Sequence, residues 1–187
     1  GSSKSSLLFS LAFLYQTPGL IRDAVIRVRD NDARFVYGIS DKRTGGLDMQ
    51  RPDGNPPAVF PTALLKGKTP APFKAEPVGG GGNRMHHKFV VIDFDKPSAR
   101  VYLGSYNFSK AADVTNGENL ILARDRRIAV SYMVEALRLF DHYHFRIAQK
   151  EAKVAGTKLQ LKLPPADGGD PWFLKDYTDS RRIKDRE

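Results

Sequence analysis

The sequence contains no cysteine, only one tryptophan and no apolar run long enough to cross a membrane. The absence of cysteine excludes disulfides and thiolate metal sites, and it leaves the cellular compartment undecided. The apolar stretch of residues 7–15 falls well short of the ~20 residues that span a bilayer, and it lacks the small-residue cleavage site of a signal peptide. We therefore expect no transmembrane segment.

The bulk composition is typical of a soluble globular protein. The chain has 187 residues, of which 41% are hydrophobic and 27% charged, which is enough for one domain with a proper core. The net charge of +9 favours anionic partners such as phosphate esters, nucleic acid or phospholipid surfaces, although it also serves solubility. Composition alone does not separate these possibilities.

The first forty residues predict a β-α-β unit. Residues 7–15 are expected to form a buried strand, and Pro18-Gly19 opens a helix with Ile21 and Val25 on its apolar face. Residues 33–39 form the next strand. A right-handed crossover then makes the two strands parallel.

The middle and the end of the chain have a different character. Residues 41–84 are rich in proline and glycine, contain a short apolar run at 58–60, and are interpreted as a binding loop with a hinge at Gly79–Gly82 or as a plain linker. Residues 128–150 predict a long helix with Met133, Leu137 and Phe140 on one stripe. We expect α/β architecture, a mixed sheet flanked by helices, in one domain over residues 1–187.

The C-terminal region carries three further expectations. Residues 159–163 alternate like a strand, and Pro171-Trp172-Phe173 is predicted to dock on the body. Residues 180–187 are highly charged and expected to be a mobile tail.

Residues 85–93 form the strand around which the site is predicted. Side chains alternate faces along a strand, so His86 and Lys88 project the same way and Asp93 projects the other way. A turn at residues 96–98 leads to a second predicted strand, residues 100–108, in which Ser105 and Asn107 share a face. If both faces coincide in one sheet, an imidazole, an ammonium, a hydroxyl and a carboxamide converge. This set suits a phosphate and contains no metal-ligand cluster.

The same residues carry a family resemblance. His86-x-Lys88-x4-Asp93, then Gly104-Ser105-x-Asn107, then Asn116-x-Glu118-Asn119 resembles the HxKx4D signature of the phospholipase D superfamily. Three elements occur in the family's order, whereas one HxK alone would be weak. His87 does not fit the register. The resemblance implies one half of a phospholipase D-like α-β-α sandwich and metal-independent phosphodiester chemistry without a cofactor.

The candidate roles follow from the chemistry of these groups. His86 is the candidate nucleophile, which forms a phosphohistidine. Glu118 is expected to orient the His86 ring, and Lys88 and Asn107, with Ser105 and Gly104, to bind the phosphate oxygens. Asp93 is expected to be structural.

One half of the site is missing from this sequence. The family's mechanism needs a second histidine to protonate the leaving oxygen, and His142 and His144 lack the flanking lysine pattern. A homodimer could supply a second His86. Alternatively, the chain is the C-terminal half of a two-motif enzyme, which its abrupt start after a Gly1-Ser2 pair typical of an expression scar favours. In that case the isolated piece should be feeble or inactive.

The substrate class stays open at this point. A phospholipase D-like hydrolase or phosphatidyltransferase acting on a phospholipid, with peripheral contact to an anionic membrane, is favoured. A nuclease of the same superfamily is the second hypothesis. It ranks below a lipase because the tyrosines and phenylalanines mostly lie at core positions and do not alternate with basic residues, as residues that stack on bases often do. A non-catalytic phosphate-binding domain is the third.

Overall fold

The computed structural model of the chain describes residues 3–17, 19–31, 33–40, 59–61, 86–157, 165, 168–180 and 182–183. Within these residues, six strands form one sheet in the order β3-β2-β1-β4-β5-β6. They are β1 (Ser6–Leu11), β2 (Phe35–Ser40), β3 (Val59–Pro61), β4 (Lys88–Ile92), β5 (Arg100–Gly104) and β6 (Leu120–Ala123). The pairs β1–β2 and β2–β3 are parallel, whereas β1–β4, β4–β5 and β5–β6 are antiparallel. The sheet is therefore mixed.

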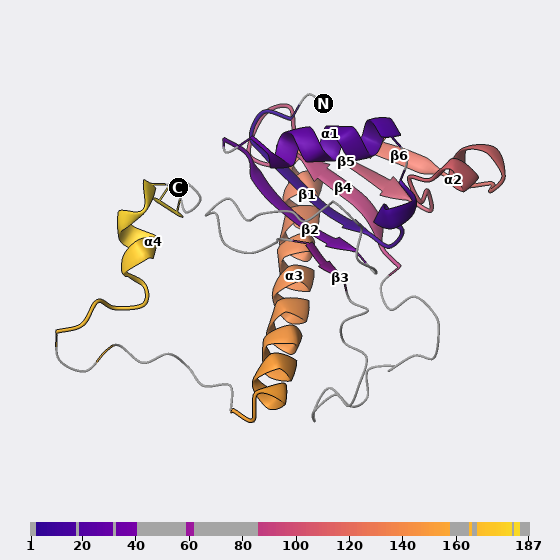
Figure 1. Ribbon diagram of the computed structural model, residues 1–187. Coiled ribbons are helices and arrows are strands. Elements are labelled where there is room, and N and C mark those ends of the chain that lie inside the picture. The colour runs from indigo at the N-terminus through magenta and orange to yellow at the C-terminus, as the bar shows by residue number, and fades with distance from the viewer. Residues whose placement is uncertain are drawn as a thin grey trace.

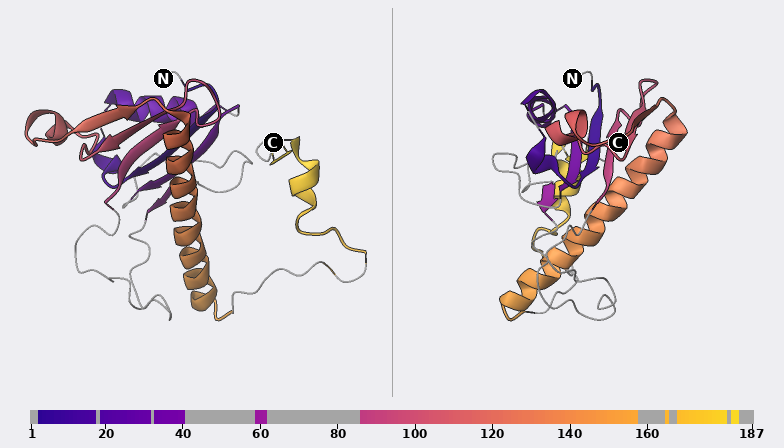
Figure 2. Two further views of the ribbon diagram at one scale, coloured as in Figure 1. Left: turned by 180° about the vertical axis from the view of Figure 1, so that it is seen from behind. Right: turned by 90° about the vertical axis from the view of Figure 1, so that its right-hand side faces the viewer.

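Helices cover both faces of this sheet. Helix α1 (Gly19–Arg29) lies over one face and α3 (Arg126–Val154) crosses the other, with the sheet between them in the right-hand view of Figure 2. A 3-10 turn (Leu14–Gln16) and the short helices α2 (Lys110–Val114) and α4 (Leu174–Thr178) complete the described elements (Figure 1). The predicted α/β class, a mixed sheet flanked by helices, is confirmed.

The core is built on β1, all of whose residues are buried. Leu8 and Val91, paired across β1 and β4, are both 0% exposed. From α3, Phe140 packs edge-on against Tyr37 of β2, with ring centroids 4.8 Å apart. Burying one such apolar side chain contributes about 1.5–3 kcal/mol. This packing fixes β4, the strand that carries Lys88, in the middle of the sheet.

Several predicted boundaries were wrong in an informative way. β1 ends at Leu11 instead of continuing to residue 15, and β5 ends at Gly104 instead of residue 108. β4 begins at Lys88, so His86 precedes the strand. In α1, Val25 is buried as expected but Ile21 is exposed.

The described part of the proline- and glycine-rich segment, residues 59–61, forms β3, which pairs in parallel with β2. The predicted hinge at residues 79–82 and the strand-like piece at residues 159–163 lie outside the described residues, as does most of the 180–187 tail. Trp172 packs on Phe173 and is half exposed, and Figure 1 shows α4 to the side of the sheet. The predicted docking of residues 171–173 on the body is therefore not observed.

Candidate active site

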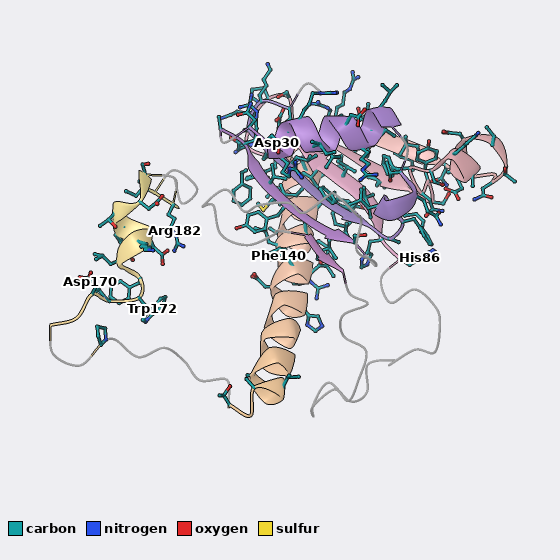
Figure 3. The ribbon with its side chains drawn as sticks, in the orientation of Figure 1. Asp30, His86, Phe140, Asp170, Trp172 and Arg182 are labelled. Atoms are coloured by element: carbon teal, nitrogen blue, oxygen red, sulfur yellow. The ribbon has the colours of Figure 1, made fainter. Side chains whose placement is uncertain are left out.

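The predicted site lies at the end of the sheet where β4 begins, and Figure 3 shows His86 there. The backbone N–H of Ala12 donates to the carbonyl of His87 at 3.0 Å, which ties this segment to the chain leaving β1. The Lys88 ammonium donates to the carbonyl of His86 at 3.0 Å. His86 and Lys88 are thus held together directly beside the sheet.

An aromatic residue that the sequence reasoning missed completes this pair. The Phe13 ring meets the His86 imidazole edge-to-face, with centroids 5.7 Å apart. The Lys88 Nζ atom lies 5.7 Å from the centroid of the same ring, within cation–π range. Phe13 follows β1, and Leu11 pairs with Lys88. The antiparallel β1–β4 register, once known, is the signal that would have found it.

His87 belongs to the opposite side of the sheet. Its ring lies 6.3 Å from that of Phe89, which packs on Tyr132 of α3. Desolvation lowers the pKa of His87, and the charge of Glu135 on α3 opposes this shift only partly. Neighbouring histidines therefore face different environments.

The Gly104-Ser105 corner is locked to the chain ahead of β6. The Ser105 N–H donates to the side-chain oxygen of Asn119 at 3.0 Å, and the Asn119 N–H donates to the Ser105 hydroxyl at 2.9 Å. Gly104 has φ +135°, a backbone conformation that favours glycine. A Cβ atom at Gly104 would lie 2.4 Å from the Asn119 side-chain oxygen, so only glycine fits.

Asn107 is positioned by Glu118. One carboxylate oxygen accepts the Asn107 backbone N–H at 2.7 Å, and the other accepts its side-chain amide at 2.8 Å. Asn116 donates to the same carboxylate at 2.9 Å. Among the described residues, Glu118 is bonded to these two asparagines and not to His86, so its orienting role toward the imidazole stays a prediction.

Electrostatic coupling links the two parts of the site. Desolvation lowers the pKa of Lys88, while the negative charge of Glu118 acts to raise it. For Glu118 itself, desolvation acts to raise the pKa, but the hydrogen bonds from Asn116 and Asn107 and the charge of Lys88 outweigh it and leave the pKa lowered. The structure therefore places a carboxylate within electrostatic reach of the ammonium, on the side where Asn107 lies.

Asp93 lies away from this site and is fully buried. Its Oδ1 accepts the backbone N–H groups of Lys4 and Ser5 at 2.7 and 3.0 Å, and its Oδ2 accepts the Ser98 hydroxyl at 2.9 Å. Desolvation acts to raise the pKa of Asp93, yet these hydrogen bonds lower it overall. The carboxylate joins the start of the chain to the turn between β4 and β5.

A known protein family matches most of this chain. The family model described as "Cardiolipin synthase, PLD-like domain" matches residues 2–140. The chain therefore belongs to the phospholipase D-like family. It is 46% identical over 48 residues to a phospholipase D of Rickettsia felis, a match that covers 26% of this chain and 22% of that protein.

Two further similarities are more partial. The chain is 41% identical over 59 residues to a mitochondrial cardiolipin hydrolase of Xenopus tropicalis, which covers 32% of this chain and 26% of that protein. The matched stretches thus span about a quarter of these relatives. The phospholipase D family member Nuc from Salmonella typhimurium aligns with a TM-score of 0.40 and 19% identity, over 79% of this chain and 81% of that chain.

Two features are absent from the part of the chain that the structure describes. None of its helices is long and apolar enough to cross a membrane. In the same residues, histidines and carboxylates do not gather into a group of three or more that could hold a metal ion.

Proposed function

We propose that this protein is a phosphodiesterase or phosphatidyltransferase of phospholipase D type that works through a phosphohistidine on His86. The observation that carries this proposal is the pairing of His86 with Lys88 at one end of β4, within electrostatic reach of Glu118, which holds Asn107. An imidazole nucleophile, an ammonium and a carboxamide are the groups that an attacked phosphate needs.

The reaction has two displacements. The imidazole nitrogen of His86 forms a bond to phosphorus, the bond to the leaving alkoxide breaks, and that oxygen takes a proton from a general acid. Water or an alcohol then attacks phosphorus and gives its proton to the group that served as the acid. The bond to the imidazole breaks, and the product is a phosphate monoester with water or a new diester with an alcohol. Lys88 and Asn107 would stabilise the charge on the non-bridging oxygens in both steps.

The general acid comes from a second HxK half-site. A second copy of this chain or a preceding half of a longer protein would supply it. The concentration dependence of activity separates the two, because a homodimeric site loses activity on dilution. Adding an excess of the inactive variant His86→Ala to the wild type would lower the activity, through mixed dimers that lack one His86, only if two chains share a site.

A phospholipid is the favoured substrate. The names of the relatives, phospholipase D and mitochondrial cardiolipin hydrolase, support this choice. Phosphatidylcholine, cardiolipin and plasmid DNA tested side by side in chelator would divide a lipase from a nuclease. The absence of turnover on all three, with phosphate binding retained, would favour a non-catalytic phosphate-binding domain.

Trapping the intermediate is the direct test. The protein is mixed with phosphatidylcholine or cardiolipin, quenched in alkali and analysed by mass spectrometry for a phosphatidyl adduct, or the glycerophosphoryl group that remains after alkaline loss of the acyl chains, on the His86 peptide. His87→Ala is the matched control, because His87 lies one residue away and faces α3. We expect an adduct in the wild type and in His87→Ala but not in His86→Ala. An adduct that persists in His86→Ala contradicts the proposal.

A further inference from the structure

The sheet face that carries Lys88 continues into an apolar surface. Val90 of β4 pairs with Tyr102 of β5, and Tyr102 pairs with Leu122 of β6, so these three side chains project from one face. By alternation along β4 and β6, Lys88 and Leu120 project from that face as well. These five side chains make up the Lys88 face.

The two faces of the sheet are not equally covered. On the face that α3 crosses, Val91 of β4 and Val101 of β5 are 0% exposed. Their neighbours on the Lys88 face, Val90 and Tyr102, are only partly buried. The Lys88 face is therefore an apolar surface that this chain covers incompletely.

The exposure is greatest on β6, the last strand of the described sheet. Leu120 is 46% exposed and Leu122 is 38% exposed. Helix α1 lies on the same side of the sheet, opposite to α3 in the right-hand view of Figure 2, and its Leu20 is 85% exposed. In soluble proteins, a patch of exposed apolar side chains marks a surface that binds another molecule.

This surface reaches the candidate active site. Phe89 pairs with Leu103. The next step of the ladder sets Lys88 opposite Gly104, which in turn pairs with Leu120. Neighbouring strands lie about 4.8 Å apart, so Leu120 is two strands and roughly 10 Å from Lys88. A molecule seated on Leu120 and Leu122 therefore lies beside the phosphate site, which still needs a second HxK half-site.

The size of a relative favours a second copy of this chain as the occupant. The 48 matched residues make up 22% of the Rickettsia felis phospholipase D, so that protein has about 220 residues. The family domain takes residues 2–140 of this chain, and two domains of that size do not fit into about 220 residues. A protein of that length has room for one such domain, so a site with two histidines needs two chains.

We propose that the Lys88 face binds the Lys88 face of a second copy of this chain, so that each copy brings its His86 to the other's site. A two-fold axis relates the two copies, and the interface is isologous. The axis passes near Lys88, Gly104 and Leu120, where two imidazoles can lie on opposite sides of one phosphate. This inference rests on the proposed function for what the second copy contributes, whereas the interface itself is tested without any substrate.

Sedimentation equilibrium of the full chain over a range of concentrations is the first test. Leu122→Glu places a carboxylate inside the interface and should raise the dissociation constant of the dimer about tenfold or more. The matched control is Ile121→Glu. Ile121 is the adjacent residue of β6 and is 52% exposed, but it projects from the face that α3 crosses. Thermal unfolding of both variants shows that the fold is retained.

Cross-linking locates the two-fold axis. The chain has no cysteine, so an introduced thiol reports on one position alone. A short bismaleimide should join two copies of Leu120→Cys, which lie close to the axis. It should not join two copies of Ile121→Cys, whose thiols lie on the outer faces of the dimer.

The outcomes separate the interface from the chemistry. A dimer that Leu122→Glu dissociates and Ile121→Glu does not supports the interface, even where the protein cleaves no phosphodiester and the proposed function fails. A wild type that stays monomeric, equal losses in the two glutamate variants, or cross-linking through Ile121→Cys overturns it. A monomer whose binding to phosphatidic acid vesicles is lost in Leu122→Glu would also overturn it, because the surface would then meet a membrane. In each case the adduct on His86 tests the proposed function separately.

Discussion

The Glu118 carboxylate holds Asn107 at two points, through its backbone N–H at 2.7 Å and its side-chain amide at 2.8 Å. This arrangement turns the amide nitrogen of Asn107 toward the carboxylate. Its Oδ1 atom is buried and, among the described residues, has no hydrogen-bond partner. Glu118 therefore determines how Asn107 is presented, and Asn107 is the link through which Glu118 influences the phosphate site.

Glu118→Gln is expected to lower kcat about a hundredfold with little change in KM. In this variant one carboxylate oxygen is replaced by an NH2 group, which cannot accept a hydrogen bond from Asn107. The side chain of Asn107 is then misplaced relative to the reacting phosphate. Steady-state kinetics on a chromogenic phosphodiester measure the effect. Asn116→Ala is the control, since it removes only one hydrogen bond to the carboxylate and should cost less than about tenfold. Equal losses in both variants would contradict the positioning role.

The lowered pKa of Lys88 predicts the alkaline limb of the pH–rate profile. A lowered pKa means that the ammonium loses its proton at a lower pH than a free lysine, so activity should fall with rising pH before the ordinary lysine range is reached. The charge of Glu118 acts to raise this pKa, so Glu118→Gln should move the limb to still lower pH. Lys88→Arg should abolish the limb in any variant that retains measurable activity.

The shift of this limb, and not the rate itself, is the decisive measurement. A limb that stays in place in Glu118→Gln would show that Lys88 and Glu118 do not interact electrostatically. A limb that persists in Lys88→Arg would assign it to another group.

Phe13→Leu is expected to reduce kcat/KM about tenfold. The ring packs on both His86 and Lys88, and losing an aromatic pair together with a cation–π contact costs about 1–2 kcal/mol. Because the cation–π contact stabilises the charged ammonium, its loss should also move the alkaline limb to lower pH. Phe13→Tyr keeps the ring and should restore both properties. If Phe13 serves only in packing, Phe13→Leu would lower the melting temperature and leave the alkaline limb of the pH–rate profile in place.

Particular elements and residues show how much of this structure the sequence predicts. The central parts of β4 and β5, and the helix that buries Phe140, follow from apolar runs and from helical periodicity, whereas the antiparallel pairing of the two strands was not predicted. The relation of Ser105 to Asn107 does not follow from such patterns, because β5 ends at Gly104 and alternation stops there. Their positions depend on hydrogen bonds from Asn119 and Glu118, which lie eleven to fourteen residues away in the chain. A local pattern does not encode such contacts.

Phe13 was not predicted as part of the site for the same reason. It reaches the site only because β1 and β4 are neighbours in the sheet, a pairing of segments that are remote in sequence. Its apolar surroundings indicated burial and nothing more. Likewise, the β3 strand inside a proline-rich segment is fixed by pairing with β2 and not by its own three residues.

Asp93→Asn is expected to destabilise the fold by about 3 kcal/mol at neutral pH. The carboxylate is buried and accepts from two backbone N–H groups and a hydroxyl, and hydrogen bonds to a charged group contribute roughly 1.5–3 kcal/mol each. Because the folded pKa is lowered, this stability is present above the unfolded pKa of ~3.9 and is lost as pH falls through the folded value. Denaturant unfolding at pH 7 and at low pH should therefore show a difference between the variants that shrinks in acid. A difference independent of pH would contradict the role of the ionised carboxylate.

Gly104→Ala tests whether the corner after β5 sets the geometry of the site. Alanine at φ +135° is strained by about 1–3 kcal/mol, and its Cβ would meet the side-chain and backbone oxygens of Asn119 at 2.4 and 2.5 Å. Because those oxygens accept from Ser105 and Tyr106, the clamp on this loop must open. We expect lower stability and a loss of activity larger than the fraction unfolded explains. Gly117→Ala is the matched control: a Cβ atom there meets nothing within 4 Å, so stability should stay the same or rise by about 0.4–1 kcal/mol. Full activity in a folded Gly104→Ala protein would mean that the Ser105–Asn119 clamp is not needed for the chemistry.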